Sequence, residues 1–294
     1  MKKYCDLHTH SVFSDGTWTP SQIIEKAGSL GLSSVALCDH NTVSGLPDFI
    51  KAAEGRDIEA VCSCEFSVDY EGKEKHLLGL FIKPCASDKV TALLDEALAK
   101  KEQSNLDLVA RLKNAGYAVD YDKIKEENPG ATINRAHIAR ELTRLHYTTS
   151  VSEAFSTLLS PAAGFYVEPE RLTVWQVIEF ICSIGAVPVL AHPFLELNEL
   201  ELREFLTKAA PFGLCGIEAE YTLFDSEERA LLRDIARDFG ILTSGGSDFH
   251  GETKPDTHIG IGTGDLRVPA EWMNELKRWG SNLLGQFTNC TREG

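Results

Sequence analysis

The sequence predicts an α/β protein built on a largely parallel β-sheet, either open or closed into a barrel, with a helical insertion. Short apolar runs rich in β-branched residues alternate with amphipathic helical patterns, and this alternation is typical of a parallel sheet covered by helices. A more polar and predominantly helical stretch, from about Val90 to about Pro169, interrupts the alternation. The 294 residues suffice for one large domain with a sizeable insertion.

Local signals place the individual elements. Thr19 and Pro20 open the first helix, and Gly116 ends the long helix of the insertion. The turn cluster at residues 126–130 separates two insertion helices. We expect strands at residues 4–10, 34–40, 58–68, 76–82, 186–191, 214–221 and 241–244, and helices at residues 20–30, 92–115, 135–145, 174–184 and 226–239.

These elements divide the chain into three parts. Residues 1–90 and 170–280 are expected to form the sheet or barrel domain, and residues 91–169 a helical insertion packed over one end of it. The tail after Gly280, residues 281–294, has a weak pattern and is expected to be disordered.

Composition excludes several classes of protein. A net charge of −15 argues against binding long nucleic acid, but cations and a few arginines can still attract a small anionic substrate. No apolar run is long enough to span a bilayer, and the first residues lack the apolar core of a signal peptide, so we expect a cytoplasmic protein without a membrane partner. Six cysteines lie in apolar stretches and are expected to be unpaired core residues: Cys5, Cys38, Cys62, Cys64, Cys182 and Cys215.

Nine potential metal ligands lie in or near predicted strands, most of them at the carboxyl ends. His8 and His10 form an H-x-H pair whose rings share one face of a strand, and Asp248 and His250 form a D-x-H pair directly after another strand. In a parallel barrel, reactive groups collect at the carboxyl ends of the strands. The predicted ligands are His8, His10, Asp15, His40, Glu65, His76, His192, Asp248 and His250.

The combination of these residues indicates a metal centre, although each alone is a weak signal. A single histidine at a strand end is usually a hydrogen-bonded structural residue, whereas two paired motifs together with further histidines at other strand ends are hard to produce by chance. Imidazole and carboxylate ligands suit Zn, Mn or Fe better than Ca or Mg alone. The set exceeds the needs of one ion, so we expect two or three divalent ions, with Glu65 as the best candidate for a bridging carboxylate.

Taken in order along the chain, these motifs resemble the polymerase and histidinol phosphatase (PHP) family from residue 4 to about residue 265. The resemblance implies a distorted (β/α)7 barrel, similar to a TIM barrel, and metal-dependent phosphoesterase activity. The matching segments are Asp6-Leu7-His8-Thr9-His10, Ser14-Asp15-Gly16, Cys38-Asp39-His40-Asn41, Glu65-Phe66-Ser67, Ala191-His192-Pro193 and Ser247-Asp248-Phe249-His250-Gly251.

Within that family the chain looks similar to phosphoesterases with a helical insertion, which act on 3′,5′-bisphosphonucleotides or on the 5′ ends of short RNAs. Residues 76–80, 134–140 and 164–167 carry this closer resemblance. It implies one ion at His8, His10, Glu65 and Asp248, a second at Asp15, His40 and His250, and a third at Glu65, His76 and His192. The chain departs from its relatives at Cys64, where they often carry glycine, and at Lys100, Lys101 and Asn105, where they tend to carry arginine.

The expected reaction is attack on phosphorus by a hydroxide held between the ions, which would also hold the non-bridging oxygens. Arg135 and His137 of the insertion are expected to bind a phosphate, because an arginine offers a bidentate fork that matches phosphate oxygens. Lys101 is the cation that the first insertion helix offers in place of arginine, and Ser11 is a further candidate donor to phosphate. On helix 135–145, the same interpretation places Arg140 and Arg144 beside His137 on a face away from the buried stripe.

Two other functions stay open at this stage. A small-metabolite phosphatase such as a histidinol phosphatase would use the same ligands, but the insertion motif at residues 134–137 argues against it. A non-catalytic metal- or nucleotide-binding module is disfavoured by the complete ligand set. An insertion that caps the site would favour mononucleotides, whereas an open groove would admit short oligonucleotides. The sequence does not indicate the oligomeric state.

Overall fold

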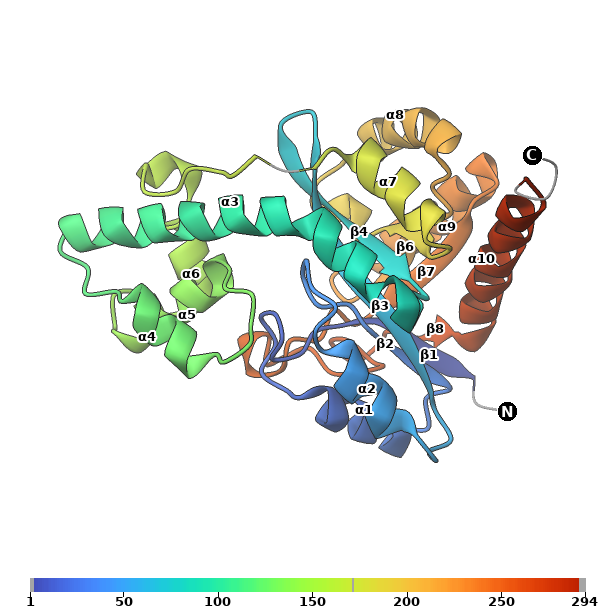
Figure 1. Ribbon diagram of the computed structural model, residues 1–294, viewed down its shortest axis with the longest axis horizontal. Coiled ribbons are helices and arrows are strands. Elements are labelled where there is room, and N and C mark those ends of the chain that lie inside the picture. The colour runs from blue at the N-terminus through green and yellow to red at the C-terminus, as the bar shows by residue number, and fades with distance from the viewer. Residues whose placement is uncertain (1–2, 171, 291–294) are drawn as a thin grey trace.

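The computed structural model describes residues 3–170 and 172–290. Within these ranges one eight-stranded sheet forms the centre of the fold (Figure 1). The strands are β1 (Tyr4–Thr9), β2 (Ser34–Leu37), β3 (Glu59–Tyr70), β4 (Lys73–Leu80), β5 (Val187–Leu190), β6 (Gly216–Tyr221), β7 (Leu242–Gly246) and β8 (Val268–Pro269). Their order, β7-β6-β5-β4-β3-β2-β1-β8, keeps the first seven strands in sequence. The α/β class predicted from the sequence is confirmed.

The sheet closes almost completely into a barrel because the segment after β7 returns to β1. The N–H of His10 donates to the carbonyl of Phe249 at 2.9 Å, and the N–H of Asp248 donates to the carbonyl of His8 at 2.8 Å. Thr9 and Phe249 also form a parallel bridge. The seven-stranded barrel that the resemblance implied is thus joined at the two segments that carry the H-x-H and D-x-H motifs, and β8 adds a short antiparallel strand to β1.

Strand β4 corrects the expectation of a largely parallel sheet. It runs antiparallel to both β3 and β5, whereas the pairs β1–β2, β2–β3, β5–β6 and β6–β7 are parallel. The cause is a two-residue turn at Glu71 and Gly72, which both have positive φ, as a tight β-hairpin requires. Strand β3 therefore continues to Tyr70, and Glu65 lies within the strand instead of at its end.

Ten helices are present in the described ranges, six of which cover the barrel. Most of them begin at a side chain that caps the first turn, as Thr19, Thr173, Asn198 and Asp225 do. The helices are α1 (Pro20–Ser29), α2 (Leu46–Ala53), α3 (Ser87–Asn114), α4 (Tyr121–Glu127), α5 (Arg135–Arg144), α6 (Val151–Ser156), α7 (Val174–Ser183), α8 (Glu199–Ala209), α9 (Ser226–Phe239) and α10 (Ala270–Cys290).

Helix α3 connects the barrel to the inserted helices. Val90 and Leu94 near its beginning belong to the apolar cluster between the sheet and its surrounding helices. Leu108 and Leu112 near its end belong to a separate apolar cluster formed with α4, α5 and α6. Figure 1 shows this second body projecting from the barrel, with α4–α6 beside the far half of α3. We call residues 91–169 the cap, and the division from the barrel at residues 90 and 170 stays a proposal, since α3 itself crosses the first boundary.

Helix α10 runs through residues that we expected to be disordered. It continues from Ala270 to Cys290, and the remaining tail, residues 291–294, lies outside the described residues. The sequence pattern weakens at Gly280, but a Cβ at this position would lie 2.8 Å from Val187 Cγ2. The glycine thus permits α10 to pack closely on β5 and does not end the helix.

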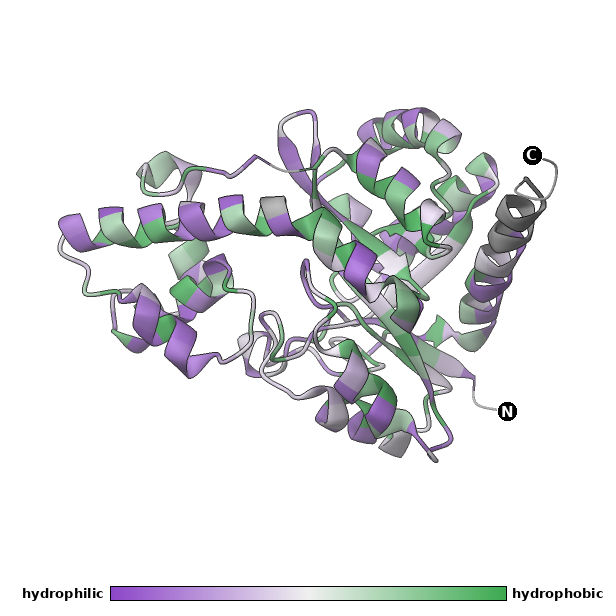
Figure 2. Cartoon of the chain, viewed as in Figure 1, coloured by the Kyte–Doolittle hydropathy of each residue, from purple (hydrophilic) through white to green (hydrophobic). Residues whose placement is uncertain are grey.

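Hydropathy follows this architecture. Figure 2 shows that apolar residues predominate in the central strands, whereas the helices around them carry both apolar and polar residues. The six cysteines predicted to be unpaired core residues are buried and free, as expected. None of the helices in the described ranges combines the length and the apolar character needed to cross a bilayer.

Candidate active site

Three histidines meet one oxygen of Glu65, which is almost fully buried. His8 and His10 come from the end of β1, and His40 follows β2. Their nearest ring nitrogens lie 3.2, 3.1 and 3.3 Å from Glu65 Oε2. Strands β1, β2 and β3 are neighbours in the sheet, so the order of the strands brings these side chains together.

Two further histidines meet the other oxygen of Glu65. His76 Nδ1 lies 2.9 Å and His192 Nε2 lies 3.1 Å from Glu65 Oε1. The β3–β4 hairpin places His76 opposite Ser67, on the strand next to Glu65. His192 follows β5 with a φ of +28°, a backbone conformation that is strained for a residue other than glycine. Its N–H donates to Glu218 Oε2 at 2.8 Å, and this bond holds the strained conformation.

Asp15, Asp248 and His250 complete the cluster on the side of β1 and β7. His250 Nε2 lies 3.2 Å from Asp15 Oδ1, and His250 Nδ1 lies 3.4 Å from Asp248 Oδ1. The same Asp248 oxygen lies 3.2 Å from His10 Nε2. All nine predicted ligands therefore gather at one mouth of the barrel.

The environment of His10 supports a cation at this mouth. Both ring nitrogens of His10 are buried and form no hydrogen bond with any residue that the structure describes, although carboxylate oxygens of Glu65 and Asp248 lie close by. Buried polar atoms normally have a partner, so these nitrogens fit metal ligation. Burial alone would raise the pKa of Glu65, but the neighbouring imidazoles hold that pKa well below its ordinary value and keep the carboxylate ionised.

The geometry of the donor atoms favours more than one ion. Within the described residues, three overlapping groups have ligand atoms within 4.8 Å of one another. They are His8, His10 and Glu65; His10, Asp15, His40 and His250; and His40, Glu65 and His76. Imidazole and carboxylate donors in these numbers fit a divalent metal centre, with Glu65 shared between two of the groups.

Two buried aspartates that the sequence analysis did not single out hold the ligand loops. Asp39 accepts hydrogen bonds from the backbone and hydroxyl of Ser11 and from the hydroxyl of Ser14, each at 2.7 Å. Asp6 accepts hydrogen bonds from the backbone and hydroxyl of Ser247 and from the backbone of Gly260. These bonds hold the loops that present Asp15 and Asp248. Each aspartate lies one or two residues before a predicted histidine ligand, which is the signal that could have identified it.

The second oxygen of Asp248 has its own partners. The Tyr221 hydroxyl donates to Asp248 Oδ2 at 2.8 Å, and the Lys254 ammonium donates to it at 2.5 Å. These two donors orient the carboxylate so that Oδ1 faces the imidazoles. Neither Tyr221 nor Lys254 is among the site residues predicted from the sequence.

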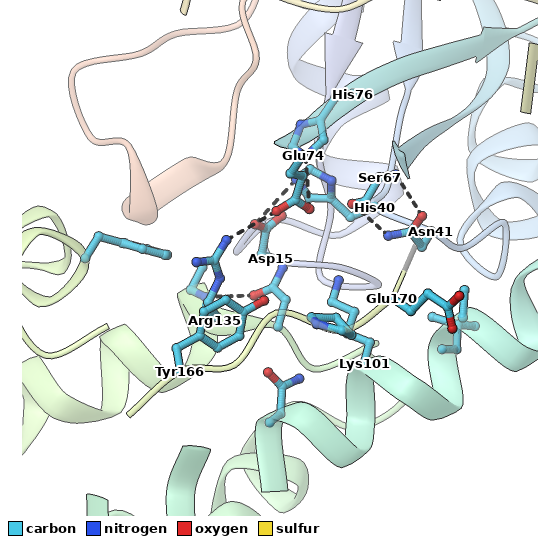
Figure 3. Close-up of a pocket in the computed structure, with 17 residues that line it drawn as sticks. Asp15, His40, Asn41, Ser67, Glu74, His76, Lys101, Arg135, Tyr166 and Glu170 are labelled. Atoms are coloured by element: carbon cyan, nitrogen blue, oxygen red, sulfur yellow. Dashed lines mark hydrogen bonds and ion pairs between the residues drawn. The ribbon is translucent and has the colours of Figure 1, made fainter. Parts of the chain in front are cut away.

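A cavity of about 260 Å³ lies between the mouth of the barrel and the cap (Figure 3). Asp15, His40 and His76 contribute to its wall on the side of the barrel, and Lys101 and Arg135 contribute on the side of the cap. Three of the predicted metal ligands and two of the predicted substrate-binding cations therefore face the same space. Residues of the cap thus lie across this cavity from the mouth of the barrel.

Arg135 stands at the first turn of α5 between an acid and two aromatic rings. Its Nη2 lies 3.3 Å from Glu74 Oε2, and its guanidinium carbon lies 4.3 Å from the ring centroid of Tyr166 and 5.7 Å from that of Phe155. Glu74 in turn lies 3.6 Å from His76 Nε2. Figure 3 shows Arg135 and Glu74 in line with His76, so the cation of the cap reaches toward the ligand cluster.

The structure gives the other two predicted substrate contacts different surroundings. Ser11 is fully buried, and both of its donor groups are engaged by Asp39, so its expected role in phosphate binding has no geometric support. His137 is buried, and its Nδ1 accepts the N–H of Asn134 at 3.2 Å. Burial and the nearby Arg140 lower the pKa of His137 to about 4, so it is neutral near pH 7 and offers no charge to a phosphate.

Arg140 joins the cap to the ligand loops. Its Nη1 donates to the carbonyl of Asp15 at 2.9 Å and to the hydroxyl of Thr253 at 2.8 Å. Arg144, which the sequence analysis placed on the same face, instead pairs with Glu141. One turn of α5 thus supplies Arg135 to the cavity and the next supplies Arg140 to the loop that carries Asp15.

The fold and the site together define a barrel protein with a multi-histidine centre for divalent metal ions. The chain belongs to the PHP domain family, whose model matches residues 6–168. It is 31% identical to a 5′-3′ exoribonuclease of Haemophilus influenzae over 85% of this chain and 91% of the relative. It is 28% identical to a 3′,5′-nucleoside bisphosphate phosphatase of Chromobacterium violaceum, over 87% of this chain and 90% of the relative.

A solved structure agrees in fold. A Bifidobacterium adolescentis protein described as a candidate metal-dependent phosphoesterase superposes with a TM-score of 0.82 and 27% identity. The similarity covers 92% of this chain and 94% of that protein, so it includes both the barrel and the cap.

Proposed function

We propose that this chain is a metal-dependent phosphoesterase that hydrolyses a phosphate ester of a nucleotide. The preferred substrate is a 3′,5′-bisphosphonucleotide, which yields a nucleoside 5′-phosphate and inorganic phosphate. The observation that carries the proposal is the convergence of five histidines on the two oxygens of Glu65, directly below a cavity lined by Arg135 and Lys101.

The ligand groups divide the expected work. His8, His10, Glu65 and Asp248 would hold one ion, Asp15, His40 and His250 a second, and Glu65, His76 and His192 a third. Divalent ions of Mn, Fe or Zn in such a site lower the pKa of bound water and offset negative charge on phosphoryl oxygens. The number of ions, two or three, and their identity as Mn, Fe or Zn belong to the proposal.

The cap would bind the part of the substrate that does not react. Arg135 can exchange its contact with Glu74 for two parallel hydrogen bonds to a phosphate group, and Lys101 adds a second positive charge on α3. Tyr166 lines the same cavity and offers a ring face to a base. The cap covers the ligand cluster and therefore favours a mononucleotide, because the rest of a longer nucleotide chain would have to extend out of the cavity beside the cap.

A second candidate function is 5′ to 3′ cleavage of short RNA. The similarity to the Haemophilus exoribonuclease favours it, and the chemistry at phosphorus would be the same. In this function the cavity would hold the 5′ end of the strand. The two functions differ in whether the hydrolysed bond belongs to a terminal 3′-phosphate monoester or to a phosphodiester that joins the first nucleotide to the rest of an RNA.

Phosphate release tests the proposal directly. We expect purified Mn²⁺-loaded protein to release phosphate from 3′-phosphoadenosine 5′-phosphate much faster than from histidinol phosphate, and Asp248→Ala to abolish the reaction. A parallel assay on a 5′-phosphorylated RNA of a few nucleotides would separate the second function from the first. Equal rates for wild type and Asp248→Ala would contradict the assignment of Asp248 to the active site. If the metal-loaded protein hydrolysed no phosphoester, the chain would be a non-catalytic binding module and not an enzyme.

The cytoplasm is the compartment we propose for this reaction. The seven cysteines whose side chains the structure describes are unpaired, which suits a reducing compartment.

A further inference from the structure

Glu218 is a fully buried carboxylate that the proposed ligand groups do not include. It lies on β6, and its Oε1 and Oε2 lie 3.1 and 3.3 Å from His8 Nδ1. Its Oε2 also accepts the backbone N–H of His192 at 2.8 Å. One carboxylate thus contacts two predicted ligands that come from β1 and from the loop after β5.

We infer that Glu218 is a positioning residue that prepares His8 and His192 to bind different ions of the centre. This inference rests on the proposal that the histidine cluster holds divalent metal ions. A carboxylate accepts hydrogen bonds, so His8 must carry its proton on Nδ1, and its Nε2 lone pair then faces Glu65 and Asp248. The partner of the second ring nitrogen sets both the tautomer and the orientation of a metal-bound histidine.

The contact with His192 acts on the backbone. His192 has φ +28° and is followed by Pro193, so the chain changes direction abruptly where β5 ends. The bond to Glu218 holds the peptide group in this unfavourable conformation and directs His192 Nε2 toward Glu65 Oε1. Because one side chain supports both residues, a change at Glu218 should affect two ions together.

Glu220 on the same strand provides a matched control. A register irregularity between residues 218 and 220 turns the two carboxylates to different surroundings. Glu220 pairs with Arg233 and lies 3.7 Å from Arg229 of α9, away from the histidines. Glu220→Gln therefore removes a nearly buried charge from β6 without touching a predicted ligand.

The substitution Glu218→Gln separates positioning from packing. Glutamine has nearly the same shape but only one acceptor oxygen. Its NH₂ group must therefore take the place of Oε1, beside His8 Nδ1, or of Oε2, beside the N–H of His192, and meets a donor in either position. We expect Mn²⁺ binding, measured by titration calorimetry below the melting temperature of every variant, to weaken about 10- to 100-fold. The number of bound ions at saturating Mn²⁺ should match wild type, and Glu220→Gln should bind Mn²⁺ with wild-type affinity.

Other results would overturn the inference. An affinity of Glu218→Gln within twofold of wild type would show that Glu218 does not position the ligands. Loss of one ion at saturating Mn²⁺ would make Glu218 a ligand, and equal weakening in Glu220→Gln would indicate a general effect of β6. If wild-type protein itself bound no Mn²⁺, the proposed metal centre would fail and the inference with it.

Discussion

Replacing Arg135 with alanine should impair catalysis far more than folding. In the folded protein its ion pair with Glu74 is about one quarter exposed on each side, and such pairs contribute about 0–1 kcal/mol. The contact with the Tyr166 ring adds about 0.5–1 kcal/mol. The free energy of unfolding should therefore fall by about 1 kcal/mol. If Arg135 instead donates two hydrogen bonds to a substrate phosphate, at about 1.5–3 kcal/mol each, their loss exceeds that amount.

Arg135 gives up its contacts with Glu74 and Tyr166 when it binds substrate, and this cost offsets part of the gain. The net loss of transition-state stabilisation in Arg135→Ala is therefore about 3 kcal/mol, which corresponds to a fall of about 100-fold in kcat/KM. The assay is phosphate release from 3′-phosphoadenosine 5′-phosphate, with chemical denaturation as the measure of stability. Arg144→Ala on the same helix is the control, because Arg144 pairs with Glu141, and we expect nearly wild-type kinetics. A loss of less than threefold for Arg135→Ala would refute the assignment of Arg135 to the substrate.

Three further experiments test other parts of the structure. Removal of metal by a chelator should abolish phosphate release, and Mn²⁺ at about 100 times its Kd should raise the free energy of unfolding by about 2.7 kcal/mol, seen as a higher Tm; an unchanged Tm would argue against a folded-state metal centre. Gly246→Ala would place a Cβ 2.4 Å from the backbone nitrogen of His8 and should destabilise the protein by about 3 kcal/mol. The control Gly28→Ala, in open space on α1, should stabilise it by about 0.5–1 kcal/mol. Similar denaturation midpoints for the two variants would contradict the close packing of Gly246 on His8. Arg140→Met removes the bond to the Asp15 carbonyl and should lower both stability, by about 1–2 kcal/mol, and kcat/KM; wild-type kinetics would mean that the cap does not position Asp15.

Much of the site could be predicted because its ligands occur in short motifs at predicted strand ends. His8 and His10 share a face through strand alternation alone, and Asp248 and His250 follow the strand predicted at residues 241–244. A parallel sheet brings such residues to one edge whatever the exact curvature. The ligand candidates therefore did not depend on knowing the strand order, and the structure gathers all nine.

The direction of β4 could not be predicted, because the turn at Glu71 and Gly72 lacks the asparagine or aspartate typical of this hairpin. Glu218 was missed for a different reason. It shares β6 with Glu220, and strict alternation would put both carboxylates on the same face, whereas an irregularity that the sequence does not indicate separates them. The role of a lone buried acid depends on tertiary contacts that no local pattern encodes.

The substrate contacts were partly predicted, since the helical phase of α5 gives the face of a residue but not its depth. Arg135 and Lys101 line the cavity, whereas His137 is 2% exposed and serves as a buried partner of Asn134. Arg140 could not be assigned in advance, because its partners Asp15 and Thr253 lie more than 100 positions away in the sequence.

Anomalous diffraction from Mn²⁺-loaded crystals, collected at the manganese absorption edge, tests the central claim most directly. We expect at least two strong peaks between the histidines, with both oxygens of Glu65 within bonding distance of an ion and Arg135 facing the peaks across the cavity. Crystals that contain manganese only on the surface, with the cluster around Glu65 empty, would contradict it.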